Sequence, residues 1–360
     1  MAVPVEDLLE RLVRIPSPTG HEAEAVGFLQ DQAREDGLRV TTDAAGNFLA
    51  EAGRGARTLL FVGHVDTVPG TIPVRRDGDV LWGRGTVDAK GCLVAAYEAA
   101  RRHLDDEGLR VRIVGAVEEE GDSRGAKALD RSQRPDWILV GEPSGADGLT
   151  IGYKGILRGR LRVEKPVQHG GHPGHGAVET FIDCWSRVRE ELAFADGFHT
   201  RQGRLDRIAS HHDGLTDLVH AAFQVRLPPS TSPQATMEAM HAIAARFGAQ
   251  AVFTEALAAH VADRRTPLVA AFLATLRARG LQPHLKVKTG TADFNHLAAW
   301  FPGVPIAAYG PGDSSLDHTP EERIHLQELR DAVETLEAVL ARLAALPAPT
   351  PASAPALPVA

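Results

Sequence analysis

The sequence predicts an α/β fold in which a smaller α+β domain is inserted into a larger domain. Three observations predict it. The chain has 360 residues, more than a single hydrophobic core usually serves. Up to Gly155, helical and strand-like apolar patterns alternate, as they do in α/β sheets. Beyond Gly155, strands of alternating polarity are separated by helices, which is typical of a small α+β domain.

The first part of the chain is expected to begin with a helix pair and to continue into a buried sheet. Within residues 4–37, Leu8, Leu12, Val26 and Leu29 recur at helical spacing, and two prolines separate the two runs. The segments LRVTTD, GNFLAEAG and RTLLFVGHVD are short β-branched or aromatic runs closed by Gly or Asp, hence strands. An Ala-rich helix over 91–104 and the strands VRIVGAV and WILVGE follow.

The middle of the chain is expected to form the inserted domain, after which the chain returns to the first domain. The strands ILRGRLRVE, LVHAAFQVRLP and QAVFTEAL alternate with helices over 177–195 and 233–247. A helix over 266–279, the segment VKTGTADFNHLA, the strand VPIAAYG and a long helix over 321–345 follow. The predicted divisions are 1–155 and 263–345 for the first domain, 156–262 for the inserted domain, and 346–360 for a disordered Pro/Ala tail.

Composition limits the classes of function. The 47 acidic residues outnumber the 39 Lys and Arg residues, giving a formal charge of -8, and no basic stripe with interleaved aromatic residues is visible. Nucleic acid is therefore not expected as a partner. The N-terminus, MAVPVEDLLERLVRI, indicates an amphipathic helix, neither a signal peptide nor a membrane span. Cys92 and Cys184 stand far apart outside any CxxC motif, so we expect both to be buried and reduced in a cytoplasmic protein.

Side chains of metal-binding type stand at the ends of several apolar runs. Imidazole suits zinc and cobalt, while carboxylates can bridge two cations that hold a hydroxide between them. Two histidines and several carboxylates therefore favour a hydrolase with two divalent metal ions. The candidates are His64 in FVGHVDT, Asp88 in GRGTVDAKG, Glu119 and Glu120 in VEEEG, Glu142 in GEPSG and His318 in DHTPEE.

Each motif also has a purely structural interpretation. Asp66 follows His64 by two positions on the same face of a strand end, where it would fix the imidazole tautomer, but a surface HxD pair looks the same. Asp88 is equally compatible with a helix N-cap. The run Glu118–Glu120 fits a solvated acidic turn as well as a cation site. The segment Thr319–Glu322 is a candidate capping box ahead of the last helix.

The order of these motifs resembles the aminoacylase, acetylornithine deacetylase and succinyl-diaminopimelate desuccinylase family of co-catalytic zinc peptidases. HVDTVPG, WGRGTVDAKG, a Glu pair after a strand, GEP, a His-Gly-Gly-His-Pro segment and DHTPEE carry the resemblance, which extends over residues 5–345. It implies a zinc- or cobalt-dependent amide hydrolase whose catalytic domain is interrupted by a lid domain that also forms a homodimer. The implied ligands are His64 and Glu142 for one ion, Glu120 and His318 for the other, and Asp88 as the bridge.

The resemblance also implies which glutamate is the general base. Family members have Asp-Glu-Glu, with the first Glu as base, the second as ligand, and a Gly-small pair five positions after the ligand. Placing Glu120 as ligand makes the Gly125–Ala126 pair fit, so the base is Glu119. The alternative frame, with Glu118 as base and Glu119 as ligand, stays open.

Two further groups complete the implied site. Asp66 would orient His64. A lid histidine would reach the partner subunit and stabilise the oxyanion, and in VQHGGHPGHGAVE we choose His169, with His172 as the alternative. For the product's α-carboxylate we expect either Arg226 or the backbone N–H groups of a glycine turn, Gly310 to Gly312.

Within the family, four segments resemble the enzymes that release lysine or ornithine from the γ-carboxyl of the C-terminal glutamate of an amino-group carrier protein, in lysine and arginine biosynthesis. They are GAVEEEG, VGEPSGADGLTIGYKG, KTGTADFNHL and AYGPGDSSLDHTPEERI. The alternatives are a deacylase of a small N-acyl amino acid, of the acetylornithine deacetylase or desuccinylase type, and a carboxypeptidase. The carrier is itself acidic, so a local basic surface would have to offset the net charge, such as Arg158, Arg160 and Arg162.

Overall fold

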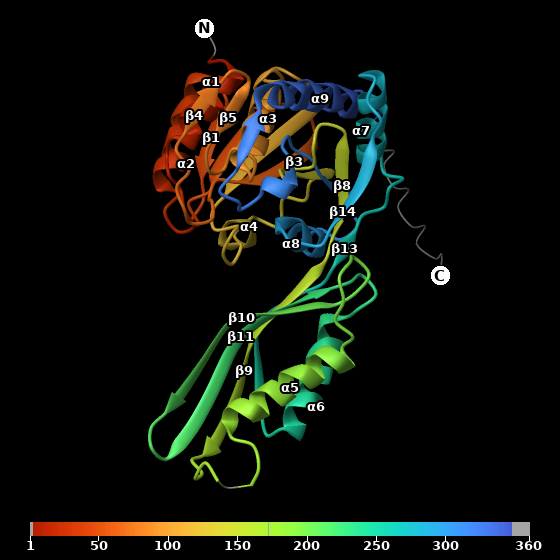
Figure 1. Cartoon of the computed structure of the whole chain (residues 1–360). Coiled ribbons are helices and arrows are strands. Elements are labelled where there is room, and N and C mark those ends of the chain that lie inside the picture. The colour runs from red at the N-terminus through yellow and green to blue at the C-terminus, as the bar shows by residue number, and fades with distance from the viewer. Residues whose placement is uncertain (1–2, 172, 348–360) are drawn as a thin grey trace, which may run out of the picture.

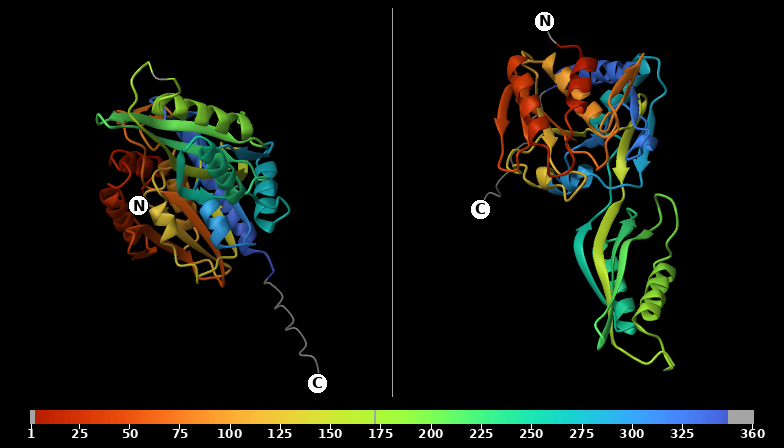
Figure 2. Two further views of the ribbon diagram at one scale, coloured as in Figure 1. Left: turned by 90° about the horizontal axis from the view of Figure 1, so that it is seen from below. Right: turned by 60° about the vertical axis from the view of Figure 1, so that its left-hand side comes forward.

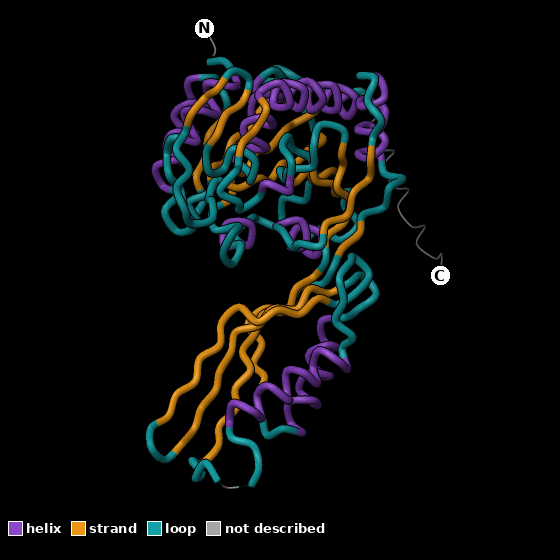
Figure 3. Tube along the Cα trace, in the orientation of Figure 1, coloured by secondary structure: helices purple, strands orange, loops and turns teal. Residues whose placement is uncertain are grey.

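The computed structural model describes residues 3–171 and 173–347 and shows a mixed α/β molecule of two lobes (Figure 1). The larger lobe contains both ends of the described chain, and the smaller lobe projects from it through neighbouring strands (Figures 2 and 3). The tail predicted at 346–360 lies, from residue 348 onward, outside the described residues. No helix in the described part has the length and apolar character needed to cross a membrane.

A nine-stranded sheet forms the centre of the larger lobe. Its strands are β1 (Arg39–Thr42), β2 (Phe48–Gly53), β3 (Arg57–His64), β6 (Leu109–Ala116), β7 (Trp137–Val140), β8 (Gly148–Tyr153), β13 (His260–Val261), β14 (His284–Lys288) and β15 (Ile306–Ala308). Their spatial order is β1-β2-β6-β3-β7-β15-β8-β13, and β14 pairs with β8. Because β3 runs parallel to both β6 and β7, the carboxyl ends of these three strands meet at one edge of the sheet.

Helices and a small sheet surround the central sheet. The helices are α1 (Val5–Val13), α2 (Ala23–Glu35), α3 (Lys90–Arg101), α4 (Arg124–Lys127), α7 (Pro267–Ala278), α8 (Asp293–Trp300) and α9 (Leu326–Ala344), with a 3-10 turn, η1, at Ser314–Leu316. Helix α3 packs against β3 and α9, and α9 also contacts α1 and α7. The small sheet joins β4 (Arg75–Asp77), β5 (Val80–Trp82) and β16 (Arg323–His325), which ties the C-terminal segment to the N-terminal half.

The smaller lobe, called the lid below, has a four-stranded antiparallel sheet in the order β10-β11-β9-β12. Its elements are β9 (Gly155–Pro166), α5 (Ala177–Glu191), β10 (Gln202–His212), β11 (Thr216–Leu227), α6 (Pro233–Arg246) and β12 (Gln250–Leu257). Both helices cover the same face of the sheet (Figure 1). Side chains such as Leu161, Phe181, Trp185 and Phe223 form a core there that is separate from the core of the larger lobe.

The predicted elements are present, with differences that have physical reasons. The helix expected over 321–345 begins only at Leu326, because the preceding three residues pair with β5 as β16. The sequence patterns do not predict β8, which contains two glycines, or β10, which is polar because it lies at the edge of the lid sheet. Cys92 and Cys184 are free and buried, as expected. The domain boundaries stay predictions.

Candidate active site

The side chains of metal-binding type converge where three parallel strands end. His64 is the last residue of β3, the pair Glu119–Glu120 follows β6, and Glu142 follows β7. Asp88 comes from the turn before α3, and His318 comes from the loop after η1. Residues from both parts of the larger lobe therefore meet at the carboxyl edge of its sheet, where ligands of α/β proteins bind.

His64 is held so that one ring nitrogen faces the other candidate ligands. Its Nδ1 lies 2.9 Å from the backbone carbonyl oxygen of Asp66 and 3.5 Å from a carboxylate oxygen of the same residue. A proton on Nδ1 would leave the Nε2 lone pair free to bind a metal ion. The Asp66 carboxylate also accepts the N–H groups of Glu119 at 3.0 Å and Glu120 at 3.1 Å. Asp66 thus positions both the imidazole and the turn that carries the two glutamates.

Asp88 stands between the two histidines. Its Oδ1 is 3.1 Å from Nε2 of His64, and its Oδ2 is 2.9 Å from Nε2 of His318. These two distances place each carboxylate oxygen beside a different imidazole, which is the arrangement that a carboxylate bridging two cations requires. The peptide bond that follows Asp88 is cis.

Glu322 holds the turn that presents Asp88. Its side chain is fully buried and accepts the N–H groups of Gly85, Val87 and Asp88 at 2.9, 3.0 and 3.2 Å. The capping box expected from Thr319 and Glu322 is therefore wrong, because the glutamate binds a distant turn and α9 begins after it. A buried carboxylate with three backbone donors fixes the position of the central ligand.

His318 and Glu120 lie on the side of the cluster formed by the late loop. Nε2 of His318 is 2.8 Å from Oε1 of Glu120. The φ angle of His318 is 61°, a left-handed conformation that is uncommon for residues other than glycine and that clusters at functional sites. Hydrogen bonds to Asp88 and Glu120 raise the pKa of His318 to about 10. Ligand atoms of His64, Asp88 and Glu120 lie within 4.8 Å of one another.

The three consecutive glutamates have different surroundings. Glu118 forms an ion pair with Arg124 at 2.8 Å, so its carboxylate already has a partner outside the cleft. Glu119 lines the cleft, its Oε1 accepts the N–H of Asp293 at 3.3 Å, and burial raises its pKa well above the ordinary value. Glu120 lies among the ligand atoms described above. This placement favours the frame in which Glu119 stands beside the ligand set and Glu120 belongs to it.

Glu142 lines the same cleft as Asp88, Glu120 and His318. Its carboxylate is buried and lies 3.7 Å from Nζ of Lys288. Burial raises the pKa of Glu142 to about 7, and the negative charge of Asp88 adds to the effect although Lys288 opposes it. Burial, with the charge of Asp88, also raises the pKa of Asp317 to about 8.

So dense a set of buried carboxylates fits divalent cations. Among the described residues that line the cleft, Lys288 and Arg226 are the Lys and Arg side chains, against five carboxylates: Asp88, Glu119, Glu120, Glu142 and Asp317. The raised pKa values reflect burial and uncompensated repulsion, which bound cations would relieve. Two imidazoles with several carboxylates are a donor set that suits zinc or cobalt.

The cluster forms one wall of an open cleft of about 470 Å³, to which Arg226 of the lid contributes. A buried Nη1 of Arg226 has no hydrogen-bond partner among the described residues, so it can bind an anionic group of a substrate. The turn from Gly310 to Gly312 is not brought to this cleft. The N–H of Gly312 donates to Glu328 at 3.0 Å, and Gly310 packs directly against Cys92. The N–H of Gly312 therefore has a partner within the fold, and none of the three residues of this turn lines the cleft.

His169 lies on the exposed loop between β9 and α5. This loop is at the end of the lid farthest from the larger lobe (Figure 1). Nδ1 of His169 accepts a hydrogen bond from the N–H of Gly171 at 3.1 Å. The alternative, His172, lies outside the described residues. The structure therefore does not bring His169 to the cleft of its own chain.

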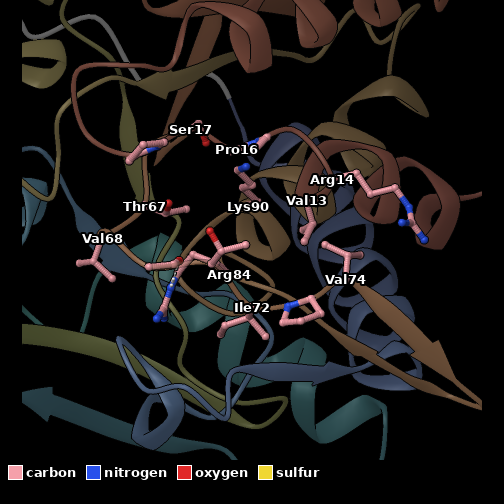
Figure 4. Close-up of a pocket in the computed structure, with 14 residues that line it drawn as sticks. Val13, Arg14, Pro16, Ser17, Thr67, Val68, Ile72, Val74, Arg84 and Lys90 are labelled. Carbon is pink, nitrogen blue, oxygen red and sulfur yellow. Dashed lines mark hydrogen bonds between the residues drawn. The ribbon is translucent and has the colours of Figure 1, made fainter.

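A second cavity, of about 330 Å³, lies beside the end of α1 (Figure 4). Apolar side chains line it together with the cations Arg14, Arg84 and Lys90. Nζ of Lys90 donates to the carbonyl oxygens of Leu12 at 3.2 Å and Ile15 at 2.8 Å, so this buried amine is engaged in the fold. No histidine or carboxylate is among its described lining residues, so it lacks the groups for metal chemistry.

Sequence reasoning missed two residues that line the main cleft and the contact of Glu322 that holds the turn of Asp88. Glu322 has the sequence signature of a helix cap, which concealed its contact with the turn before α3. Lys288 and Tyr153 line the cleft. They lie in KTGTADFNHL and VGEPSGADGLTIGYKG, two segments that carry the resemblance, but neither residue was given a role there. Their place beside the candidate ligands could not be predicted from either segment alone, because β8 and β14 become neighbours only in the folded sheet.

The chain was compared with known proteins. Residues 60–342 match the model of peptidase family M20/M25/M40. A LysW-lysine hydrolase of Deinococcus radiodurans is 43% identical over 352 residues, 94% of this chain and 96% of that protein. A putative LysW-lysine/LysW-ornithine hydrolase of Pyrococcus abyssi is 40% identical over 346 residues, 95% of this chain and 96% of that protein. A dinuclear metal-binding peptidase of the M20 family from Bacillus subtilis matches with a TM-score of 0.66 at 14% identity, covering 94% of this chain and 97% of that one.

Proposed function

Because the chain belongs to peptidase family M20/M25/M40, we propose that it is a two-metal hydrolase that releases lysine or ornithine from the γ-glutamyl C-terminus of an amino-group carrier protein. The names of relatives that are 40% and 43% identical over nearly the whole chain support this substrate. One observation carries the chemistry: Asp88 lies between the Nε2 atoms of His64 and His318. A carboxylate so placed can hold two cations close enough to share one water.

We assign the metal ligands as the family resemblance implies. His64 and Glu142 would hold one ion, Glu120 and His318 the other, and Asp88 would bridge them. Zinc and cobalt both suit these donors. When bound, two such ions lower the pKa of a shared water and polarise the carbonyl of the amide.

Glu119 is placed to move the protons of the reaction. It lines the cleft next to the ligands, and burial raises its pKa, so it can hold a proton taken from the attacking water. As the C–N bond breaks, the same carboxyl gives that proton to the departing α-amino group. Asp66 keeps Glu119 in place through the backbone N–H at 3.0 Å. Arg226, with its free Nη1, would bind a carboxylate of the substrate.

A second copy of the chain would supply a further donor. His169 is remote from its own cleft, so we propose that it stabilises the oxyanion in the partner subunit of a homodimer. Strand β10 is an unpaired edge of the lid sheet and exposes Ile208, with 53% of its surface accessible. Ile182 and Val178 on α5 are 54% and 45% exposed. Unpaired edges with apolar side chains favour association, so the lid is the expected dimer surface.

The face of the lid sheet without helices supports a protein substrate. Arg160 on β9 and Arg207 on β10 both pair in register with Ala222 of β11, so they share this face. Neither forms an ion pair within the described residues, whereas Arg158 pairs with Glu255 at 3.2 Å. This face continues toward Arg226 at the cleft end of β11 and suits an acidic carrier.

Product analysis tests the function. The purified protein, loaded with zinc or with cobalt, is offered carrier-linked lysine, carrier-linked ornithine, N-acetylornithine and succinyl-diaminopimelate. We expect free lysine or ornithine from the carrier substrates at a kcat/KM far above that for the small amides. An R160A/R207A variant should raise KM for the carrier substrates alone. Preference for a small amide would overturn the carrier assignment, and no amide hydrolysis at all would overturn the enzyme class.

The two cysteines support a proposal for the compartment. Cys92 and Cys184 are both free, buried and apart from each other in the fold. We propose that the enzyme works in the cytoplasm, where thiols stay reduced and where amino-acid biosynthesis takes place. A tagged chain found in the soluble cytoplasmic fraction, and absent from the secreted one, is the expected result.

A further inference from the structure

Tyr153 is a buried residue of the cleft whose hydroxyl is unused. The side chain is 1% exposed, and it lines the cleft together with the candidate ligands. The hydroxyl has no hydrogen-bond partner among the described residues. Buried hydroxyl groups in folded proteins are nearly always hydrogen-bonded, so an unpaired one at a reaction site calls for a ligand.

The fold holds this ring firmly in place. Tyr153 ends β8, where it pairs in register with His260 of β13 on one side and with Lys288 of β14 on the other. Its ring packs on Phe294 with the ring centroids 4.9 Å apart. Nζ of Lys288 lies 5.9 Å from the ring centroid and 3.7 Å from Glu142. The ring therefore stands next to the Glu142 side of the metal cluster and cannot turn freely.

The hydroxyl is suited to donate and not to ionise. Burial raises the pKa of Tyr153 well above its ordinary value, and the charges of Glu142 and Glu119 add to this effect. The proton therefore stays on the oxygen at neutral pH. A preorganised donor that is not satisfied in the resting fold gains most from a charge that develops only during the reaction.

We propose that the Tyr153 hydroxyl donates a hydrogen bond to the oxygen of the scissile carbonyl as that oxygen becomes an oxyanion. The inference rests on the amide hydrolysis proposed above. The hydroxyl keeps its proton throughout, and no bond to it forms or breaks. It acts from within the same chain, in addition to the histidine from the partner's lid.

The test compares Tyr153→Phe with Tyr309→Phe. Tyr309 is equally buried, but its hydroxyl donates to the carbonyl of Ala146 at 3.3 Å and it does not line the cleft. For Tyr153→Phe we expect kcat to fall about 100-fold, as for loss of one oxyanion donor, with KM changed less than about threefold. Metal content should be unchanged, and the thermal midpoint should be equal or higher because an unpaired buried hydroxyl is removed. Tyr309→Phe should show the reverse: normal kcat and a lower midpoint.

A binding measurement makes the test independent of turnover. The probe is a phosphinate analogue of γ-glutamyl-lysine, whose tetrahedral charged oxygens stand for the oxyanion, with free lysine as the ground-state reference. Tyr153→Phe should weaken phosphinate binding about 100-fold by calorimetry and leave lysine binding unchanged.

Three outcomes would overturn the inference: a kcat within about threefold of the parent enzyme, loss of metal together with activity, or equal weakening of both probes. Kinetics use whichever amide the parent enzyme hydrolyses. A failure of the carrier assignment would therefore appear in the choice of substrate and would leave the comparison of the two tyrosine variants intact.

Discussion

Removal of the Glu322 carboxylate should destabilise the larger lobe and weaken metal binding at a site that Glu322 does not touch. The carboxylate is fully buried, accepts three backbone N–H groups from the turn before α3, and pairs with Arg84 at 2.8 Å. Glu322→Ala leaves the three backbone donors without an acceptor, whereas Nη1 of Arg84 keeps its contact with the carbonyl oxygen of Thr319 at 3.1 Å. Since this turn presents Asp88, its loss should disorder that carboxylate, the proposed bridging ligand.

The magnitude follows from these contacts. A buried N–H without a partner costs about 1–3 kcal/mol, and a hydrogen bond to a charged group contributes about 1.5–3 kcal/mol. Such losses are not additive, so we expect a decrease of about 4–6 kcal/mol in the free energy of unfolding, a large part of the stability of an ordinary domain. Glu322→Gln keeps one acceptor oxygen and loses the charge, so about half of that decrease is expected.

Urea unfolding of metal-free protein, followed by circular dichroism, measures the first effect. Zinc titration of the folded variant measures the second, and we expect at least a tenfold weaker affinity. Glu321→Ala is the control, because the neighbouring side chain is 66% exposed and its ion pair with Arg323 is 3.7 Å long. A loss below about 1 kcal/mol in Glu322→Ala, or an unchanged zinc affinity, would refute the reasoning.

Three further predictions concern the base, the lid and the pH. Glu119→Gln should retain both metal ions and lose most turnover; metal analysis showing an ion lost with the activity would make Glu119 a ligand. His169→Ala and Glu119→Gln protomers, each nearly inactive, should regain activity when mixed, because one site of the mixed dimer then has both groups; no recovery despite proven subunit exchange would exclude a trans-acting histidine. Burial, with the charges of Lys127 and Arg131, lowers the pKa of His296 to about 4 from 6.5, so the unfolded chain binds more protons between these values. Stability should fall as the pH drops from 6.5 to 4, by up to about 3 kcal/mol more than in His296→Phe; equal slopes in parallel unfolding titrations would contradict this.

Site residues could be predicted from the sequence where the local pattern itself indicated a strand end, and not where a long-range contact placed them. His64, Glu120 and Glu142 each follow an apolar run, so strand ends and residue type together point to one edge of a sheet. The role of Glu322 was predicted wrongly, because its local sequence fits a helix cap whereas its side chain binds the distant turn before α3. Tyr153 lies in a segment that carries the resemblance, but its place in the cleft could not be predicted, because its environment exists only after β13 and β14 pair with β8.

The same reasoning applies to whole elements. The helices of the lid were predictable because their apolar faces pack on a sheet and repeat with helical spacing. Strand β10 shows no such pattern, since one edge has no neighbour and most of its side chains are exposed. The start of α9 was predicted too early, because Ile324 belongs to a strand pair whose partner, Leu81, is far away in the sequence.

The insertion of β15 between β7 and β8 has a consequence for the order in which the newly made chain can fold. Residues 306–308 are synthesised after both neighbouring strands. Until β15 is made, the edges of β7 and β8 that it joins have no partner strand. The lid needs only the contiguous stretch from β9 to β12, and we expect it to fold first. His318 emerges later still. An unfinished chain therefore has no complete ligand set, and amide cleavage begins only when synthesis is nearly over.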